Sequence, residues 1–536
     1  SIAEAFRSLP GIRSESSGGE GNANIAVRGL PVASGGAKFL QLQEDGLPVL
    51  EFGDITFGNA DIFLRGDFNV ARIESVRGGS ASTFASNSPG GVINLISKTG
   101  REQGGAIQAT FGLDYGEYRV DADYGGKFGD GWLYHIGGFY RGGEGPGKAG
   151  YDGNFGGQIK ANVTREFEKG YVRVYGKYLN DHAIGYLPNP VAVTGTDANP
   201  RYSDVPNFDI NNDTLHSRNF TSVQTLDGNN QPVTRNIRNG QRPLVLAGGF
   251  EASVNFADGW NVINRFRYSR ISGDFISPFP ASVGAAQATA DSIGGAGSTL
   301  RYASGPAAGQ TIANPGSLNG NGLLASIVLF DVKLNSLNNV TNDLRLTHDL
   351  EIGGAKVVLT GGIYNSRQDI KTEWLWTSHL LDVVGGGNAA LVDVFDAEGQ
   401  KVTQGGTVGF GASFFGNCCR RIYDLTYYTN APFASATVTF ADLTLDASLR
   451  YDFGRARGQV FGADLGGGRN GITSFDFDGS GTISPAEAQT SVVPLASPSP
   501  LNYNYGYVSY SFGASYRLGD SVAVFARYSR GGRANA

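Results

Sequence analysis

The chain has 536 residues, including 80 glycines, 24 tyrosines, 32 phenylalanines and 4 tryptophans, and only 17% of its residues are charged. This composition suits long β-sheets better than a helical enzyme, and the length allows either several domains or one large β-architecture. The net charge of -6, without a sustained block of lysine or arginine, excludes the electrostatic footprint of a nucleic-acid-binding protein.

The first hundred residues contain short apolar motifs separated by turn residues. These are "LPGI" (9–12), "IAVRGL" (25–30), "EDGLPV" (44–49) and a longer stretch that starts at "RIESVRGG" (72–79). The alternating runs are too short to span a bilayer and are bounded by glycines, as short buried strands are. Residues 1–102 are therefore predicted to form a compact α/β domain in which 25–30 and 72–79 are strands.

From about residue 104 the sequence alternates with period two over long runs. In 117–128, "EYRVDADYGGKF", charged residues occupy one face and Tyr, Val, Ala and Phe the other. The run 442–453, "DLTLDASLRYDF", has the same two faces. Runs of this length match the roughly 9–11 tilted residues with which a barrel strand crosses a bilayer. Residues 103–536 are predicted to form an antiparallel transmembrane β-barrel, with a soluble β-protein as the alternative.

The connections between these strands alternate in length. Short turns are expected at 128–132, 256–260, 351–356 and 517–521, and long connections at about 142–154, 181–242, 273–325, 369–421 and 455–500. Short turns at one rim and long external loops at the other are typical of outer-membrane barrels. The count is about thirteen strands, whereas bacterial single-chain barrels have even numbers, so we expect the C-terminal strands to lie beyond this chain.

The four N-terminal motifs, in this order and spacing and followed by a barrel, resemble TonB-dependent outer-membrane receptors over essentially the whole chain. The resemblance implies a plug domain inside the barrel lumen and a localisation in the bacterial outer membrane. It implies Arg28, Arg72, Glu74 and Arg77 as plug-locking residues, with ordinary surface charges as the alternative. It also implies the TonB complex as a partner, which pairs with a TonB box expected before Ser1. This chain alone is therefore expected not to engage TonB.

No catalytic motif emerges from the sequence. The five histidines are scattered without ligand spacing, and the chain contains no HExxH, phosphate loop or G-x-S-x-G elbow. The stretch "TEWLWTSHLLD" lies in an expected external loop, where Trp374, Trp376 and His379 are candidates for ligand contact or for interfacial anchoring. The adjacent Cys418 and Cys419 fall in the same loop, either as a disulfide or as two exposed thiols.

Residues 476–487, "DFDGSGTISPAE", have the oxygen-ligand spacing of an EF-hand calcium loop. Asp476, Asp478 and Ser480 fill the first three ligand positions, Thr482 offers its carbonyl, and Glu487 is the bidentate ligand. Ser484 and Glu487 form a capping box, so a short helix is expected to follow, while the preceding 466–475 is not expected to be helical. The alternative is a polar turn without an ion. We expect an optional Ca²⁺ in an external loop and no required cofactor.

Three functions fit these observations. The first is TonB-energised uptake of a scarce small ligand, with a ferric siderophore favoured over cobalamin or an oligosaccharide. The second is a passive porin-like channel, which would need the N-terminal domain to leave the lumen open. The third is a calcium-binding surface or adhesion protein that uses its long loops. We expect the protein to contact outer-membrane lipid and not to be an enzyme, with an outer-membrane hydrolase that assembles a triad in space as the alternative.

Overall fold

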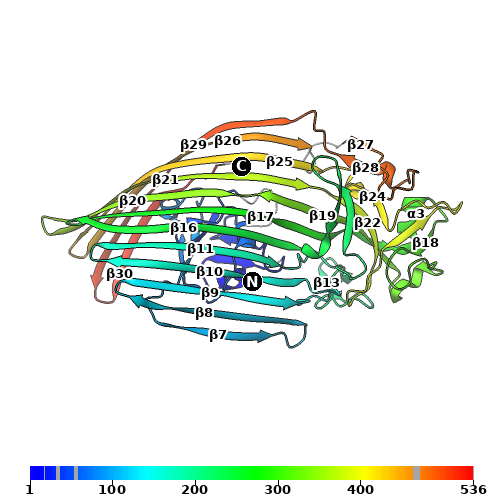
Figure 1. Ribbon diagram of the computed structural model, residues 1–536, viewed down its shortest axis with the longest axis horizontal. Helices are drawn as coiled ribbons and strands as arrows, with labels where there is room; N and C mark the ends of the chain where they lie inside the picture. Colours follow the sequence, from blue (N-terminus) through cyan, green and yellow to red (C-terminus); the bar gives the residue numbers. More distant parts are fainter. Residues whose placement is uncertain (17, 32–36, 53–57, 463–470, 535–536) are drawn as a thin grey trace.

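The computed structural model describes residues 1–536 except 17, 32–36, 53–57, 463–470 and 535–536, and it consists of a curved antiparallel wall around a small N-terminal domain (Figure 1). The wall strands are β7 (Gly104–Phe111), β8 (Glu117–Gly129), β9 (Trp132–Gly143), β10 (Asn154–Phe167), β11 (Gly170–His182), β16 (Gln241–Ala257), β17 (Trp260–Ala285), β19 (Leu323–Ser336), β20 (Asn339–Ile352), β21 (Ala355–Trp374), β25 (Arg421–Phe440), β26 (Leu443–Gly462), β29 (Ser499–Gly519) and β30 (Val522–Arg530). β19 and β20 follow one another along β17, so the described wall is thirteen strands across, as the sequence predicts. β7 and β30 are its two edges.

The wall turns its apolar face outward and its polar face toward the lumen. On β26, Leu449 and Tyr451 are 55% and 47% exposed, whereas Arg450 and Asp452, which alternate with them, are buried. Because these apolar side chains have no protein partner outside the wall, their exposure fits lipid contact. The predicted transmembrane β-barrel is confirmed.

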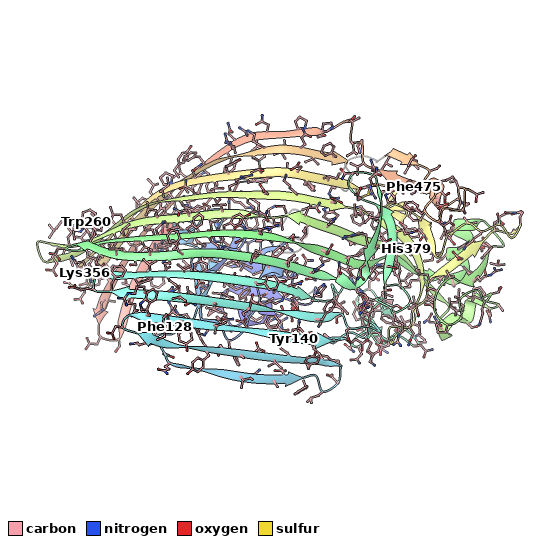
Figure 2. The ribbon with its side chains drawn as sticks, in the orientation of Figure 1. Phe128, Tyr140, Trp260, Lys356, His379 and Phe475 are labelled. Carbon is pink, nitrogen blue, oxygen red and sulfur yellow. A yellow bond between two sulfur atoms is a disulfide. The ribbon has the colours of Figure 1, made fainter. Side chains whose placement is uncertain are left out.

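Every turn at one rim of the wall has two residues. These turns are 130–131, 168–169, 258–259, 353–354, 441–442 and 520–521. In the turn 353–354, Gly353 and Gly354 both have positive φ, the backbone of a type I′ hairpin that matches the strand twist. Aromatic residues gather at this rim, where Trp260 stacks on His348 at 4.0 Å and Phe128 lies near Trp132 (Figure 2).

The opposite rim carries the long connections, but the strands reach further into them than the sequence predicts. β17 continues to Ala285, β21 to Trp374 and β26 to Gly462, so the expected loop boundaries at 273, 369 and 455 are wrong. These strand ends go on pairing with their neighbours beyond the bilayer, which satisfies their backbone groups without a loop. The connections contain β12 (Ala192–Thr196), β13 (Asn199–Ser203), β14 (Ser222–Leu226), β15 (Pro232–Asn236), η2 (Ile237–Asn239), α3 (Ala286–Gly294), β18 (Thr299–Tyr302), η3 (Pro315–Gly320), β22 (Thr377–Asp382), β23 (Val392–Phe395), β24 (Thr407–Gly409), η4 (Ser413–Phe415), β27 (Gly471–Thr473), η5 (Glu487–Gln489) and β28 (Thr490–Val492).

The N-terminal domain, called the plug below, lies inside the wall (Figure 1). Its elements are α1 (Ile2–Phe6), β1 (Ile12–Glu15), β2 (Asn24–Val27), β3 (Leu40–Glu44), β4 (Leu47–Pro48), η1 (Ala60–Phe63), β5 (Val70–Arg77), α2 (Ala81–Phe84) and β6 (Gly91–Ser97). A mixed sheet in the order β4-β3-β6-β5 forms its centre. The predicted strand at 72–79 is confirmed through Arg77, whereas the one at 25–30 ends at Val27 because Arg28 and Gly29 have positive φ. The plug ends at Ser97 and the wall begins at Gly104, so the boundary placed at 102/103 falls in the connection.

None of the helices among the described residues is long and apolar enough to cross a membrane.

Candidate functional site

A buried charge network joins the plug to strands β9 and β11. Asp181 on β11 is fully buried and accepts a hydrogen bond from Arg65 Nε of the plug at 2.7 Å. It also accepts from Arg141 Nε at 3.0 Å and from the terminal nitrogen of Arg141 at 2.7 Å. Arg141 in turn pairs with Glu20 of the plug at 3.1 Å. Burial alone would raise the pKa of Glu20, but Arg141 and Arg65 lower it to about 2. Glu20 and Arg141 therefore both stay charged.

A second network surrounds Glu44 at the end of β3. Lys177 donates to Glu44 Oε2 at 2.7 Å, and Lys160 donates to Oε1 at 3.2 Å. Lys177 also donates to the Phe63 carbonyl at 3.0 Å, and Arg267 donates to the Pro48 carbonyl. Against the effect of burial, Lys160, Lys177 and Arg267 hold the pKa of Glu44 well below its ordinary value. Lys160 on β10 and Lys177 on β11 thus both bind the Glu44 carboxylate of the plug.

A third network lies further along the wall, on strands β21 and β26. Tyr364 on β21 donates to Glu51 Oε1 at 2.6 Å, and Asn87 donates to Glu51 Oε2 at 2.8 Å. Ser86 of the plug donates to Asp452 and accepts from Arg450 on β26. Burial raises the pKa of Glu51 to about 7, so this carboxyl titrates near neutrality. The plug is thus held by wall strands that range from β9 to β26.

The four residues predicted to lock the plug occupy a different surface. Arg72 and Glu74 pair with one another at 2.7 Å and are 62% and 47% exposed. Arg77 donates to the Pro10 carbonyl within the plug, and Arg28 is exposed. Their locking role stays a prediction. The buried networks were missed because their members lie far apart in the sequence, Arg65 and Asp181 being 116 residues apart. The signal available was the polar face of each wall strand.

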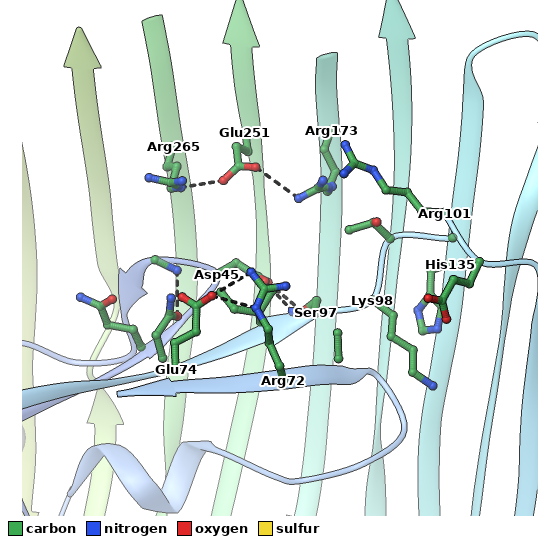
Figure 3. A pocket seen from close by; sticks show the side chains of 18 of the residues that line it. Asp45, Arg72, Glu74, Ser97, Lys98, Arg101, His135, Arg173, Glu251 and Arg265 are labelled. Atoms are coloured by element: carbon green, nitrogen blue, oxygen red, sulfur yellow. Dashed lines mark hydrogen bonds and ion pairs between the residues drawn. The ribbon is translucent and has the colours of Figure 1, made fainter. Parts of the chain in front are cut away.

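Arg72 and Glu74 face a cavity of about 1000 Å³ between the plug and the short-turn end of the wall (Figure 3). Across it, Glu251 accepts from Arg173 at 3.2 Å and from Arg265 at 2.6 Å. A cavity lined by charged side chains therefore lies beside the plug, on the side of the short turns.

Trp374, Trp376 and His379 are all buried, in β21, β22 and the link between them. The two indoles lie 5.4 Å apart, and Trp376 packs against Phe330 at 4.5 Å. Trp374 is the last residue of the 20-residue β21, so at about 3.3 Å per residue and a tilt of about 40° it lies roughly 50 Å above the short turns, beyond a bilayer core of about 30 Å. Burial lowers the pKa of His379 to about 3, so it is neutral at physiological pH. Ligand contact by these residues stays a prediction, since none is exposed in this structure.

Cys418 and Cys419 are bonded to one another, and both are buried. Trp376 Nε1 donates to the Cys419 carbonyl at 2.7 Å, so the cysteine pair and the buried indoles form one packed unit at the loop end of the lumen.

A row of lumen-facing tyrosines above the plug was not predicted. Tyr503, Tyr505 and Tyr507 on β29 are half-buried, and Tyr427 on β25 is buried against Phe52 of the plug at a ring distance of 4.4 Å. Tyr503 and Tyr505 lie 6.4 Å apart. The alternation Tyr-Asn-Tyr-Gly-Tyr at 503–507 was the available signal, because it places all three rings on one sheet face. The Tyr505 ring lies 6.5 Å from Phe52, and the Tyr507 hydroxyl accepts from Asn87 N at 2.9 Å, so the row borders the plug.

The predicted calcium loop curls as expected. Carboxylate oxygens of Asp476, Asp478 and Glu487 lie within 4.8 Å of one another. Backbone N–H groups of Ser480 and Gly481 donate to Asp476 at 3.1 and 2.9 Å. The Ser480 hydroxyl donates to the Thr482 carbonyl at 3.0 Å. Carboxylates, a hydroxyl and a carbonyl are the oxygen donors that Ca²⁺ takes, so the residues fit that ion in kind.

The capping box at the exit of this loop is also present. Ser484 N donates to Glu487 Oε2 at 2.9 Å, and Glu487 N donates to Ser484 Oγ at 3.2 Å. The exit helix is the short η5. Gln404 Nε2 bridges Asp478 and Glu487 at 2.7 and 3.1 Å and ties the loop to a neighbouring connection. In the preceding segment, 466–470 lie outside the described residues and 471–473 form β27.

The fold and its buried plug contacts define an outer-membrane β-barrel closed by an internal domain. Residues 1–92 match the TonB-dependent receptor plug domain, and residues 178–536 match the TonB-dependent receptor-like β-barrel. The chain therefore belongs to the TonB-dependent receptors, which are proteins of the bacterial outer membrane.

Individual proteins resemble this chain at low sequence identity or over a short segment. The open form of the ferric-catecholate import receptor Fiu from E. coli K12 has a TM-score of 0.61 at 16% identity, over 99% of this chain and 67% of that receptor. The siderophore receptor PiuA from Acinetobacter baumannii has a TM-score of 0.54 at 15% identity, over 98% of this chain and 61% of that receptor. The vitamin B12 transporter BtuB from Photobacterium profundum is 32% identical over 134 residues, 25% of this chain and 21% of that transporter. The first two likenesses concern the fold alone.

Proposed function

We propose that this chain belongs to a receptor that binds a scarce small ligand at the outer face and takes it up when the TonB complex moves the plug. The observation that carries the proposal is the set of buried polar networks between plug and wall. A plug held by charged and hydrogen-bonded groups fills the lumen, yet it can be displaced into water at less cost than an apolar core, because its groups are solvated when they separate. Catalysis has no part in this function.

The coupling partner is the TonB complex, by the family's mechanism. In that mechanism a short N-terminal segment of the receptor adds as a strand to the partner, and a pull along the chain reaches the plug first. The cavity beside Arg72 and Glu74 would let this side of the plug move before the buried networks break.

For the ligand we favour a ferric siderophore, and the alternatives are cobalamin or an oligosaccharide. Relatives of this fold include the ferric-catecholate receptor Fiu and the siderophore receptor PiuA, while BtuB carries vitamin B12. The tyrosine row supports an aromatic ligand, because rings stack on rings at about 4.5–7 Å. Uptake of ⁵⁵Fe-labelled catecholate by cells that carry only this receptor, compared with labelled cobalamin and maltodextrin, tests the choice. Induction by a glycan without any response to iron would contradict it.

Replacing Tyr503 and Tyr505 with alanine is expected to weaken ligand binding roughly tenfold, since each stacked ring contributes about 0.5–1.5 kcal/mol beyond its buried area. Equilibrium binding of the ferric chelate to the purified receptor measures the effect. Tyr516→Ala is the matched control, because Tyr516 lies on the same strand but is 46% exposed on the apolar, lipid-facing side. Equal affinities for all three proteins would remove the tyrosine row from the binding site.

A second proposal is that residues 476–487 bind Ca²⁺ and order this external loop. Its support is the convergence of Asp476, Asp478 and Glu487, whose charges repel one another without a cation. A single unpaired loop should bind with a Kd of about 10⁻⁴ to 10⁻³ M, the range of extracellular modules.

Asp476→Asn combined with Asp478→Asn is expected to abolish the calcium-dependent heat in calorimetric titration at millimolar Ca²⁺. These two residues are chosen because Glu487 also caps η5, so its replacement would disturb the loop in any case. Asp396→Asn, in another acidic loop turn, is the control. If the double variant titrates like the natural protein, or if the natural protein gives no heat, the loop is only a polar turn.

A further inference from the structure

The outer surface of β21, β25, β26 and β29 changes from apolar to polar along one cross-strand row. On β26 the outward residues Leu445, Leu449, Tyr451 and Phe453 are 40–55% exposed, and Arg455 follows them at the same alternation. The neighbouring strands change from apolar to polar at the same level. Phe453 pairs with Asn430 on β25 and with Gly506 on β29, and Asn430 pairs with Asn365 on β21. The change is therefore a property of the wall surface, not of one strand.

This row lies where the apolar part of the membrane ends. From Leu443, next to the short turn, to Phe453 is ten residues, which at about 3.3 Å per residue and a tilt of about 40° span roughly 25 Å, the height of the lipid-facing band of a barrel. Tyr451 and Phe453 stack at 5.4 Å at its upper edge, as interfacial aromatics do. Arg455 is thus at the headgroup level of the leaflet on the long-loop side, which faces outward in outer-membrane barrels.

The first polar row consists of Arg367, Tyr428, Arg455 and Asn504, which are cross-strand neighbours. Both guanidinium groups lie against the ring of Tyr428, Arg455 at 4.7 Å and Arg367 at 5.9 Å from its centroid. The ring thereby holds two cations side by side on the outer surface.

The next row adds Arg457, which is held in place by its own contacts. It donates to the Tyr503 carbonyl and to Asn504 Oδ1, both at 2.8 Å. Arg455, Arg457, Tyr428 and Thr426 line an open hollow of about 550 Å³ on this surface. Neither Arg455 nor Arg457 forms an ion pair with any residue that the structure describes.

The acidic groups nearby are neutralised by other cations. Asp424, which also lines the hollow, pairs with Lys371 at 3.1 Å, and Asp369 pairs with Arg367 at 3.3 Å. The hollow therefore keeps an excess positive charge, from two arginines in fixed positions, at the depth of lipid headgroups. Arginine in such a pair binds phosphate oxygens with planar, forked geometry.

We propose that this hollow, bounded by Arg455, Arg457, Tyr428 and Thr426, binds the phosphate of a glycolipid headgroup in the outer leaflet. The site is independent of the uptake proposed above, because these side chains face away from the lumen. The lipid is the occupant rather than a free anion, because the apolar surface directly below, from Leu445 to Phe453, would hold the acyl chains of the same molecule.

The test compares the binding of fluorescent diphosphoryl lipid A to the receptor in detergent micelles with the binding of the fully dephosphorylated lipid. Arg455→Gln combined with Arg457→Gln is expected to weaken binding of the phosphorylated lipid by at least roughly tenfold, because two charge-assisted contacts are lost. Binding of the dephosphorylated lipid should be the same for both proteins. The unheated mobility of each protein in SDS gels shows whether the barrel has folded.

Arg165→Gln combined with Arg517→Gln is the matched control. It removes the same charge from exposed positions at the short-turn end of the wall and should leave lipid binding unchanged. Equal affinity of the hollow variant and the natural protein would overturn the proposal. So would full competition by millimolar inorganic phosphate, which would identify a site for free anions.

Discussion

Replacing Asp181 with alanine is expected to loosen the plug more than any exposed change on its surface. Asp181 is fully buried and is shared by Arg65 of the plug and Arg141 of the wall, so its loss leaves the buried Arg65 without its carboxylate and leaves Arg141 with only its pairs to Glu20 and Glu117. Breaking a buried ion pair by removing one partner costs about 3–5 kcal/mol. Amide hydrogen exchange in β3 and β6 of the plug should therefore accelerate by roughly a hundredfold or more, as the opening free energy falls.

The matched comparison is Arg72→Gln. Arg72 pairs with Glu74 on the exposed surface of the plug, and such pairs contribute about 0–1 kcal/mol. Exchange in the plug should then change by no more than about fivefold. An Arg72 variant that releases the plug as strongly as the Asp181 variant would return the locking role to the residues that the family resemblance implies. An unaffected Asp181 variant would show that the buried network does not hold the plug.

Plug docking is expected to weaken as the pH rises from about 4.5 to 7, because of Glu51. Below its ordinary pKa of 4.5 this carboxyl is protonated whether the plug is docked or released, so it contributes no pH dependence. Between 4.5 and about 7 the released form loses its proton while the docked form keeps it, since burial raises the pKa of the docked group. The released state binds fewer protons in this window, so docking becomes less favourable by up to about 3 kcal/mol.

Glu51→Gln should therefore dock more firmly than the natural protein at pH 7.5 and should lose most of this pH dependence, as read from exchange rates corrected for their intrinsic pH dependence. In this variant a weaker dependence of plug docking on pH should persist up to about pH 6, because burial also raises the pKa of Asp61 to about 6. Glu74→Gln, an exposed carboxyl on the same domain, is the control and should retain the full slope. A Glu51 variant with an unchanged profile would show that its carboxylate is ionised when docked.

The sequence was sufficient for the architecture because the alternation within each wall strand is a local signal. The run 442–453 separates lipid-facing leucines from lumen-facing charges without any knowledge of its neighbours, and the structure places both sets as expected. The segment 369–374 was assigned to a long external connection. It is instead a strand end that rises above the membrane and pairs with β25. Alternation reports a sheet face, but not where the bilayer ends along it.

The site was less predictable because its contacts join distant parts of the chain. Tyr364 and Glu51 are 313 residues apart, and no local pattern pairs a plug carboxylate with a tyrosine among many on the wall. The acidic loop at 476–487 was predictable for the opposite reason: its ligands and its capping box lie within twelve residues.

The central claim is that the plug closes the lumen until it is pulled. Liposome swelling with the full-length receptor measures this directly, because an open lumen of a large barrel passes sugars freely. We expect no swelling in arabinose or raffinose with the natural protein, and measurable permeation of the smaller sugar with Asp181→Ala, whose plug opens more often. Rapid permeation of both sugars through the natural protein, with its plug intact, would contradict gated uptake and identify a passive channel.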